Sequence, residues 1–157
     1  MQRWTSEPLE FAFAQADVSR AILEFEGVAH DGPTFTVLTY LNNPDVPDDA
    51  GRDEAANFAA AFTVFAHGDC WGDVGHCEPR REPASAFDRR PEHPLTPANF
   101  TLDITDAVRR LVTTEGARTV TVTALVTTAA TDGRQQEPLR FDALSLVVFE
   151  TAVAADI

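Results

Sequence analysis

Apolar and polar residues alternate in short runs along most of this chain, and an alternation of period two is typical of a β-strand. The runs are rich in β-branched and aromatic residues, which strands favour. A strand with one apolar face has to bury that face against another layer. We expect core positions on most of these strands, at Leu23, Phe25, Val37, Phe62, Val64, Leu102, Ile104, Val120, Val122, Leu144 and Leu146. The predicted strands are residues 9–13, 20–28, 35–41, 58–66, 100–104, 119–127 and 141–149.

The run at residues 119–127 has the clearest alternation. One face of this run is apolar and consists of Val120, Val122, Ala124 and Val126. The opposite face consists of Thr119, Thr121, Thr123 and Leu125. This pattern predicts a strand with one buried side.

Residues 103–112 break the period of two. Their apolar residues recur at the spacing of one helical face: Ile104, Ala107, Val108 and Leu111. Asp103 or Thr105 can accept a hydrogen bond from the free amides at the start of such a helix, and Gly116 can end it. Strands in this number, with one short helix and no alternation of strands and helices, predict an antiparallel β-sandwich, either jelly-roll or immunoglobulin-like. At 157 residues the chain is long enough for one such domain, residues 1–157.

Two loops are long. Residues 42–57 carry several aspartates and two prolines; their spacing is not that of an EF-hand loop, so we expect a solvated acidic turn rather than a calcium site. The second loop, residues 68–99, holds half of the ten prolines. A loop of this length is uncommon in a compact domain unless it is functional or fastened.

Both cysteines and two of the four histidines lie within eleven residues where the proline-rich loop begins, at His67, Cys70, His76 and Cys77. Thiolate and imidazole are ligands that Cu(I) and zinc prefer, and three or four of these side chains could converge on one ion. A Cys70–Cys77 disulfide is the alternative, and would stabilise the fold by about 2–3 kcal/mol. Two free buried thiols are the third interpretation.

Other residues of the same loop extend these alternatives. His93 could act as a further ligand, and His67, His76 and His93 together would leave an open metal position for water, as in a metal-dependent enzyme. Trp71 could shield a metal or a disulfide, or anchor a partner. His30 follows the predicted strand at residues 20–28 and is expected to be an exposed loop residue.

Charge and missing motifs exclude several functions. There are 25 acidic against 12 basic residues, a net charge of −13, which repels nucleic acid and anionic membrane surfaces. No apolar run approaches the length of a membrane span and the first residues lack a signal peptide, so we expect a soluble chain, cytoplasmic by default. None of the four serines lies in a nucleophile elbow and no phosphate-binding glycine loop is present. Glu24 and Glu26 share a strand face that we interpret as solvent-exposed.

Four blocks follow one another in an order that is similar to a known family. They are Phe35-Thr-Val-Leu-Thr-Tyr40-Leu-Asn42, the strand from Phe58 to His67, the helix start from Thr101 to Leu111, and the strand from Leu139 to Glu150. This order resembles the carboxy-terminal domain of tyrosinases and plant polyphenol oxidases, over about residues 18–150. The resemblance implies a β-sandwich that covers the dicopper site of an oxidase domain and, in some members, helps to load copper.

The resemblance implies a non-catalytic partner of a tyrosinase-like oxidase, in cis or in trans. A dicopper site needs two sets of three histidines, and this chain has four in all. Copper as Cu(I) is the expected cofactor, with zinc or no metal as alternatives. The cysteine spacing differs from the Cys-x-x-Cys motif of the fungal members of that family. The prediction of a metal site is therefore based on the ligand chemistry of these residues and not on the resemblance. Tyr40, which matches the first block, is either a hydrogen-bonded core residue or, with Trp71, a residue presented to the partner's active site. The competing hypothesis is a secreted or periplasmic module in which a disulfide fastens a protein-binding loop.

Overall fold

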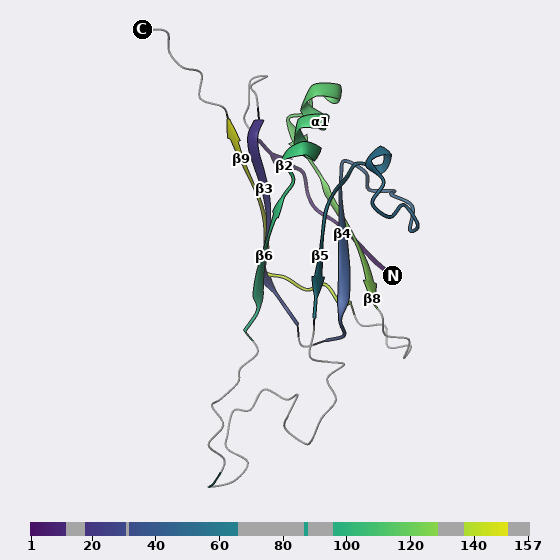
Figure 1. Ribbon diagram of the computed structural model, residues 1–157, viewed down its shortest axis with the longest axis vertical. Helices are drawn as coiled ribbons and strands as arrows, with labels where there is room; N and C mark the ends of the chain where they lie inside the picture. Colours follow the sequence, from purple (N-terminus) through teal and green to yellow (C-terminus); the bar gives the residue numbers. More distant parts are fainter. Residues whose placement is uncertain (12–17, 31, 66–86, 88–95, 129–136, 151–157) are drawn as a thin grey trace.

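The computed structural model describes residues 1–11, 18–30, 32–65, 87, 96–128 and 137–150. Two antiparallel sheets form the layers of a sandwich (Figure 1). The larger has the strand order β1 (Gln2–Thr5), β8 (Val122–Thr128), β4 (Phe35–Leu41) and β5 (Phe58–Val64). The smaller has the order β6 (Ala98–Asp103), β3 (Val18–Val28) and β9 (Ala143–Glu150). The predicted all-β fold with antiparallel sheets and one short helix is confirmed.

Four further elements complete the described fold. Strands β2 (Leu9–Glu10) and β7 (Thr119–Val120) form a separate antiparallel pair. Helix α1 (Thr105–Glu115) follows β6 directly and lies at one end of the sandwich (Figure 1). A single 3₁₀ turn, η1 (Glu54–Ala56), precedes β5.

The main core lies between the two larger sheets, as the alternation predicts. Leu23 and Phe25 of β3 face Val37 of β4, and all three side chains are fully buried. The Phe25 ring lies 5.2 Å from the rings of both Phe62 and Phe141, so aromatic contacts join the sheets. The remaining predicted core residues are buried or packed against this cluster: Val64, Leu102, Ile104, Val120, Val122, Leu144 and Leu146.

Strand β8 is buried on both faces, which corrects the prediction of one buried side. Val122, Ala124 and Val126 face the main core, while Thr123 and Leu125 on the opposite face are also inaccessible to solvent. The strand is also shorter than residues 119–127. A break follows β7 at residue 121, whose amide donates to the side-chain oxygen of Asn42 at 2.9 Å instead of continuing the ladder.

Residues 42–57 cover the outer face of β8 and β4. The acidic side chains of this segment are exposed, as predicted, but the segment also packs apolar residues on the sheet. Val46 is fully buried against Tyr40 and Leu125 in a second, smaller core. The Arg3 guanidinium donates to the carbonyl oxygen of Val46 at 2.7 Å and also contacts the Asp48 carboxylate. The acidic residues of this segment therefore lie at the rim of a packed layer.

Helix α1 covers Thr105–Glu115 rather than the predicted residues 103–112, and Gly116 ends it as predicted. Its buried face consists of Thr105, Ala107, Val108 and Leu111. The Thr105 amide donates to the Asp103 carboxylate at 3.0 Å. Gly116 ends the helix with a φ of 61°, a left-handed conformation that favours glycine, and its amide donates to the carbonyl oxygen of Val112.

Strand β1 was not predicted. Trp4 lies against Phe141 with ring centroids 5.0 Å apart, and β1 pairs along its whole length with β8. Its four residues are too few for a reliable periodic signal. The predicted strand at residues 9–13 is described as β2 only as far as residue 10; residues 12 and 13 lie outside the described part.

Candidate functional site

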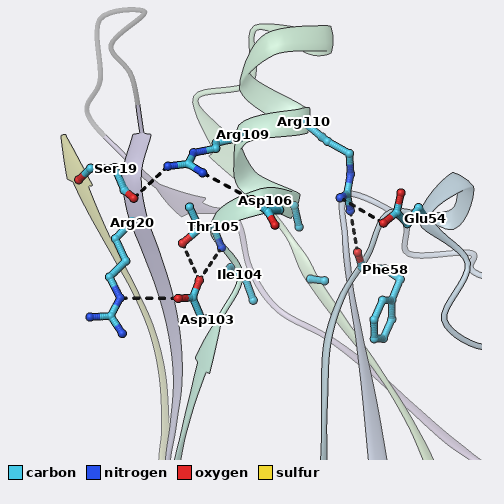
Figure 2. A pocket seen from close by; sticks show the side chains of 12 residues that line it. Ser19, Arg20, Glu54, Phe58, Asp103, Ile104, Thr105, Asp106, Arg109 and Arg110 are labelled. Carbon is cyan, nitrogen blue, oxygen red and sulfur yellow. Dashed lines mark hydrogen bonds and ion pairs between the residues drawn. The ribbon is translucent and has the colours of Figure 1, made fainter. Parts of the chain in front are cut away.

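An open pocket of about 590 Å³ lies beside the start of helix α1. Its walls come from α1, from the ends of β3 and β6 that meet it, and from η1 with the start of β5 (Figure 2). Three arginines line it, Arg20, Arg109 and Arg110, together with the carboxylates of Glu54, Asp103 and Asp106. The pocket therefore combines equal numbers of acidic and basic side chains at the boundary between the two sheets.

Arg109 holds the helix to the smaller sheet. Its Nε donates to the carbonyl oxygen of Val18 at 2.8 Å, and one terminal nitrogen donates to the carbonyl oxygen of Ser19 at 3.1 Å. The other terminal nitrogen lies 3.5 Å from the Asp106 carboxylate, one helical turn earlier. The planar guanidinium thus satisfies two backbone acceptors of β3 at once.

Arg110 holds the same helix to the larger sheet. Its guanidinium donates to the carbonyl oxygen of Phe58 at 3.0 Å, at the first residue of β5 (Figure 2). It also pairs with the Glu54 carboxylate at 3.8 Å. Because adjacent arginines bind different sheets, α1 bridges the two layers at this end.

Asp103 lies in the pocket wall between Thr105 and Arg20. Its carboxylate accepts hydrogen bonds from the Thr105 hydroxyl at 2.5 Å and from the Thr105 amide at 3.0 Å, and Arg20 lies 3.7 Å away. Hydrogen bonding by the Thr105 side chain, then by its amide, and attraction to Arg20 and Arg109 together lower the pKa of Asp103 below its usual range. Asp103 is therefore ionised throughout the neutral range.

The hydroxyls of the pocket are already committed to structural bonds. The Ser19 hydroxyl donates to the carbonyl oxygen of Phe149 at 3.0 Å. The Thr105 hydroxyl donates to Asp103 and accepts from the amide of Ala21 at 3.0 Å. These contacts support the start of the helix, so the polar groups of the pocket act chiefly to join α1 to the strands.

The residues singled out in the sequence for metal or disulfide chemistry lie outside the described part of the chain. These are His67, Cys70, Trp71, His76, Cys77 and His93. The described residues on either side fix where their segment is attached. Strand β5 ends at Val64 and β6 begins at Ala98, and both of these ends lie at the end of the sandwich opposite α1 (Figure 1).

Phe65, two residues before His67, is an exposed aromatic residue that the sequence analysis did not single out. Its side chain is 81% exposed, whereas Phe62 and Val64 of the same strand are buried. The alternation in residues 58–66 could have predicted this exposure, because it places Phe65 on the face opposite to the buried residues Phe62 and Val64. A large exposed aromatic residue is a feature of contact surfaces.

His30 lies at the same end and is partly buried, rather than fully exposed as predicted. Its Nε2 lies 2.7 Å from the carbonyl oxygen of Thr96, two residues before β6. The bond ties the turn after β3 to the chain that leads into β6.

Tyr40 is a core residue. Its side chain is fully buried, its ring contacts Phe58 edge-on, and its hydroxyl donates to the carbonyl oxygen of Gly51. Burial, and secondarily the negative charge of Asp53, raise the pKa of Tyr40 above its usual value. As folded, Tyr40 presents no surface to a partner, which corrects its candidacy as a contact residue and agrees with the alternative of a hydrogen-bonded core tyrosine.

Two features are absent from the described residues. No group of three or more histidine, cysteine, aspartate or glutamate side chains within them is arranged to hold a metal ion. No helix among them is both long enough and apolar enough to cross a membrane.

Comparisons with known proteins give no assignment. No protein-family model, curated protein or solved structure matches this chain.

Proposed function

We propose that this chain is a non-catalytic domain that covers a tyrosinase-like dicopper oxidase, in cis or in trans, and delivers copper to it. The order of the four sequence blocks supports this proposal. Two of the blocks coincide with elements of the fold: the block starting at Phe35 is β4, and the block starting at Thr101 spans the end of β6 and the start of α1.

The observation that carries the proposal is where the Cys/His segment is attached. The strands on either side of that segment, β5 before it and β6 after it, have their adjoining ends at the end of the sandwich opposite the helix (Figure 1). The exposed ring of Phe65 stands immediately before the cluster and would provide an apolar contact to the oxidase. In the sequence, an exposed aromatic residue is thus followed directly by thiolate and imidazole ligands suited to Cu(I).

The test is copper transfer. Reduced protein should retain about one Cu(I) per chain against a competing chelator, releasing protons as thiols ionise. Mixed with the copper-free dicopper domain of a tyrosinase, it should restore catechol oxidation, while the chain alone should not oxidise catechol. Cys70→Ser should abolish retention and transfer. His30→Asn is the matched control, because it removes an imidazole that lies outside the cluster in sequence, and it should behave as wild type.

Docking is tested separately from copper. Excess chain should slow catechol oxidation by the loaded dicopper domain, and Phe65→Ser should weaken this inhibition. Phe149→Ser removes an exposed aromatic residue from the sheet edge instead and should leave inhibition unchanged. No inhibition and no transfer would refute the proposal.

The disulfide-fastened protein-binding module is the competing function. It predicts no free thiol in the purified protein and no Cu(I) retention. Cys70→Ser would then lower the free energy of unfolding by about 2–3 kcal/mol without any effect of metal.

A further inference from the structure

Strand β9 is an edge strand with an open side in the described structure. It pairs along its length with β3, and no other described strand hydrogen-bonds to it. Its sequence, Ala-Leu-Ser-Leu-Val-Val-Phe-Glu, contains no proline and no charge before Glu150. Edge strands of this length usually carry charges, prolines or bulges that prevent pairing with another chain. Here the guards, a register shift opposite Glu150 and Phe149 and the charge of Glu150, are confined to the last two residues of the strand. The edge over residues 143–148 therefore indicates a strand that receives a partner.

One half of the outer face of β9 is apolar. Val147 is 44% exposed and Phe149 is 49% exposed, whereas the alternate residues Leu144, Leu146 and Val148 pack against the core. On the neighbouring strand, Ile22 lies opposite Val147. Ile22 is partly buried, and Arg20, which pairs with Asp103, lies opposite Phe149. The exposed apolar surface therefore consists of Val147 and Phe149 on the edge strand itself, where an added strand could pack two apolar side chains.

The other half of the same face is small and acidic. Ala143 and Ser145 of β9 lie opposite Glu26 and Glu24 of β3, respectively. Neither glutamate forms an ion pair with another described residue. A strand added to β9 would lie about 10 Å from β3, which is two strand spacings. Long basic side chains on that strand could reach over the short side chains of Ala143 and Ser145 to the two carboxylates.

We propose that the β9 edge binds an extended segment of a partner protein by antiparallel strand addition. The segment carries two apolar residues at alternate positions, opposite Phe149 and Val147, followed by two basic residues at the next alternate positions, opposite Ser145 and Ala143. Backbone hydrogen bonds along the edge supply affinity, and this order of side chains supplies specificity. The net charge of −13 favours a cationic segment in addition.

A second copy of this chain fits the edge less well. Its own β9 offers no basic residue to Glu24 and Glu26. The proposal is independent of the oxidase function, because the β9 edge lies along the side of the smaller sheet and Phe65 follows the end of β5 in the other sheet (Figure 1).

The test uses two labelled peptides and fluorescence anisotropy. The first is Thr-Val-Thr-Val-Thr-Arg-Thr-Arg-Thr, and the second has the same composition with the arginines before the valines. The first should bind more tightly, and its affinity should fall with added salt. The double variant E24Q/E26Q should weaken binding about three- to tenfold and reduce the salt dependence. E10Q/E115Q, which removes two exposed carboxylates elsewhere, is the matched control and should bind as wild type.

Val147→Lys should abolish binding of the first peptide, because it places a charge in the apolar half of the edge. Circular dichroism and urea denaturation should show that this variant remains folded. Equal affinity for the two peptides, or unchanged binding by E24Q/E26Q, would overturn the proposal. So would a dimer of the chain in light scattering that Val147→Lys dissociates, since the edge would then be occupied by a second copy.

Discussion

The hydroxyl of Tyr40, one residue before the end of β4, donates a hydrogen bond to the carbonyl oxygen of Gly51 in the segment that covers the outer face of the larger sheet. The two residues are eleven positions apart, yet this bond and the burial of Val46 hold the whole segment on the sheet. The side of β8 that would otherwise face solvent is closed in this way. Tyr40 therefore stabilises a layer of the fold.

Titration of Tyr40 provides a direct test of its environment. It is the only tyrosine in the chain, so absorbance near 295 nm reports its ionisation alone. Burial first, and the charge of Asp53 second, raise the pKa of Tyr40, so ionisation should begin above the ordinary value of about 10. The unfolded chain ionises at lower pH, hence the contribution of Tyr40 to stability is complete below pH 10 and is lost as pH rises through the folded pKa. An ordinary tyrosine titration in the native protein would contradict this prediction.

Tyr40→Phe should lower the free energy of unfolding by about 0.5–1.5 kcal/mol, the range for one lost hydrogen bond. Urea denaturation at pH 7 measures the change. The variant should also lose the extra destabilisation that wild type shows in alkaline solution. A variant as stable as wild type would mean that the bond to Gly51 contributes nothing.

Val122→Ala should lower the free energy of unfolding by about 1–3 kcal/mol, because it leaves a cavity between the sheets at a fully buried position. Urea denaturation followed by circular dichroism measures this loss. Val147→Ala is the matched control; the side chain is 44% exposed, and the change should stay within about 0.5 kcal/mol. Equal losses at both positions would contradict the core described here.

The elements that depend on local periodicity could be predicted from the sequence. Strand β4 occupies residues 35–41 as expected, because all seven of its residues are aromatic, β-branched or leucine. The helix was predicted from the spacing of its apolar residues and from Asp103 and Gly116 at its two ends. In both cases the information lies within about a dozen consecutive residues.

Features set by distant residues could not be predicted in this way. The packing of residues 42–57 on the sheet depends on Arg3, 43 positions before Val46, and on Leu125 of β8, which is also remote from Val46 in sequence. The pocket beside α1 depends on bonds from Arg109 to backbone carbonyls about 90 positions earlier, and a carbonyl carries no side-chain signal. The Cys/His cluster was recognised from its composition, but its ligand geometry lies outside the described residues.

Asp103 should make the stability of the helix start depend on pH. Hydrogen bonds from Thr105, chiefly from its hydroxyl, lower the pKa of Asp103 in the folded chain. The contribution of this group is therefore complete above the ordinary aspartate value of about 3.9 and is lost as pH falls through the lower folded pKa. Asp103→Ala should lower the free energy of unfolding by about 0.5–1 kcal/mol at pH 7, a modest loss because the side chain is exposed.

Urea denaturation of wild type and Asp103→Ala at pH 7 and pH 3 tests this dependence. The difference between the two proteins should shrink in acid, where wild type loses the ionised carboxylate. Asp106→Ala is a useful comparison. The Asp106 carboxylate is exposed, and the ion pair that it forms within the described residues is with Arg109. A difference that stays constant between the two pH values would exclude the ionised Asp103 as its source.

Arg109 should be more important to the attachment of the helix than its charge alone suggests. The Nε and one terminal nitrogen bind two successive carbonyl oxygens of β3, a geometry that the single ammonium of lysine cannot reproduce. Arg109→Lys should therefore lower the free energy of unfolding by about 1–2 kcal/mol. This loss is smaller than for hydrogen bonds of a buried charged group, because the Arg109 side chain is half exposed to solvent. Arg118→Lys changes an exposed arginine just beyond the helix and should stay within about 0.5 kcal/mol. If the two substitutions had the same small effect, a positive charge at residue 109 would be enough to attach α1 to the sheet. The paired hydrogen bonds to β3 would then not determine the position of α1.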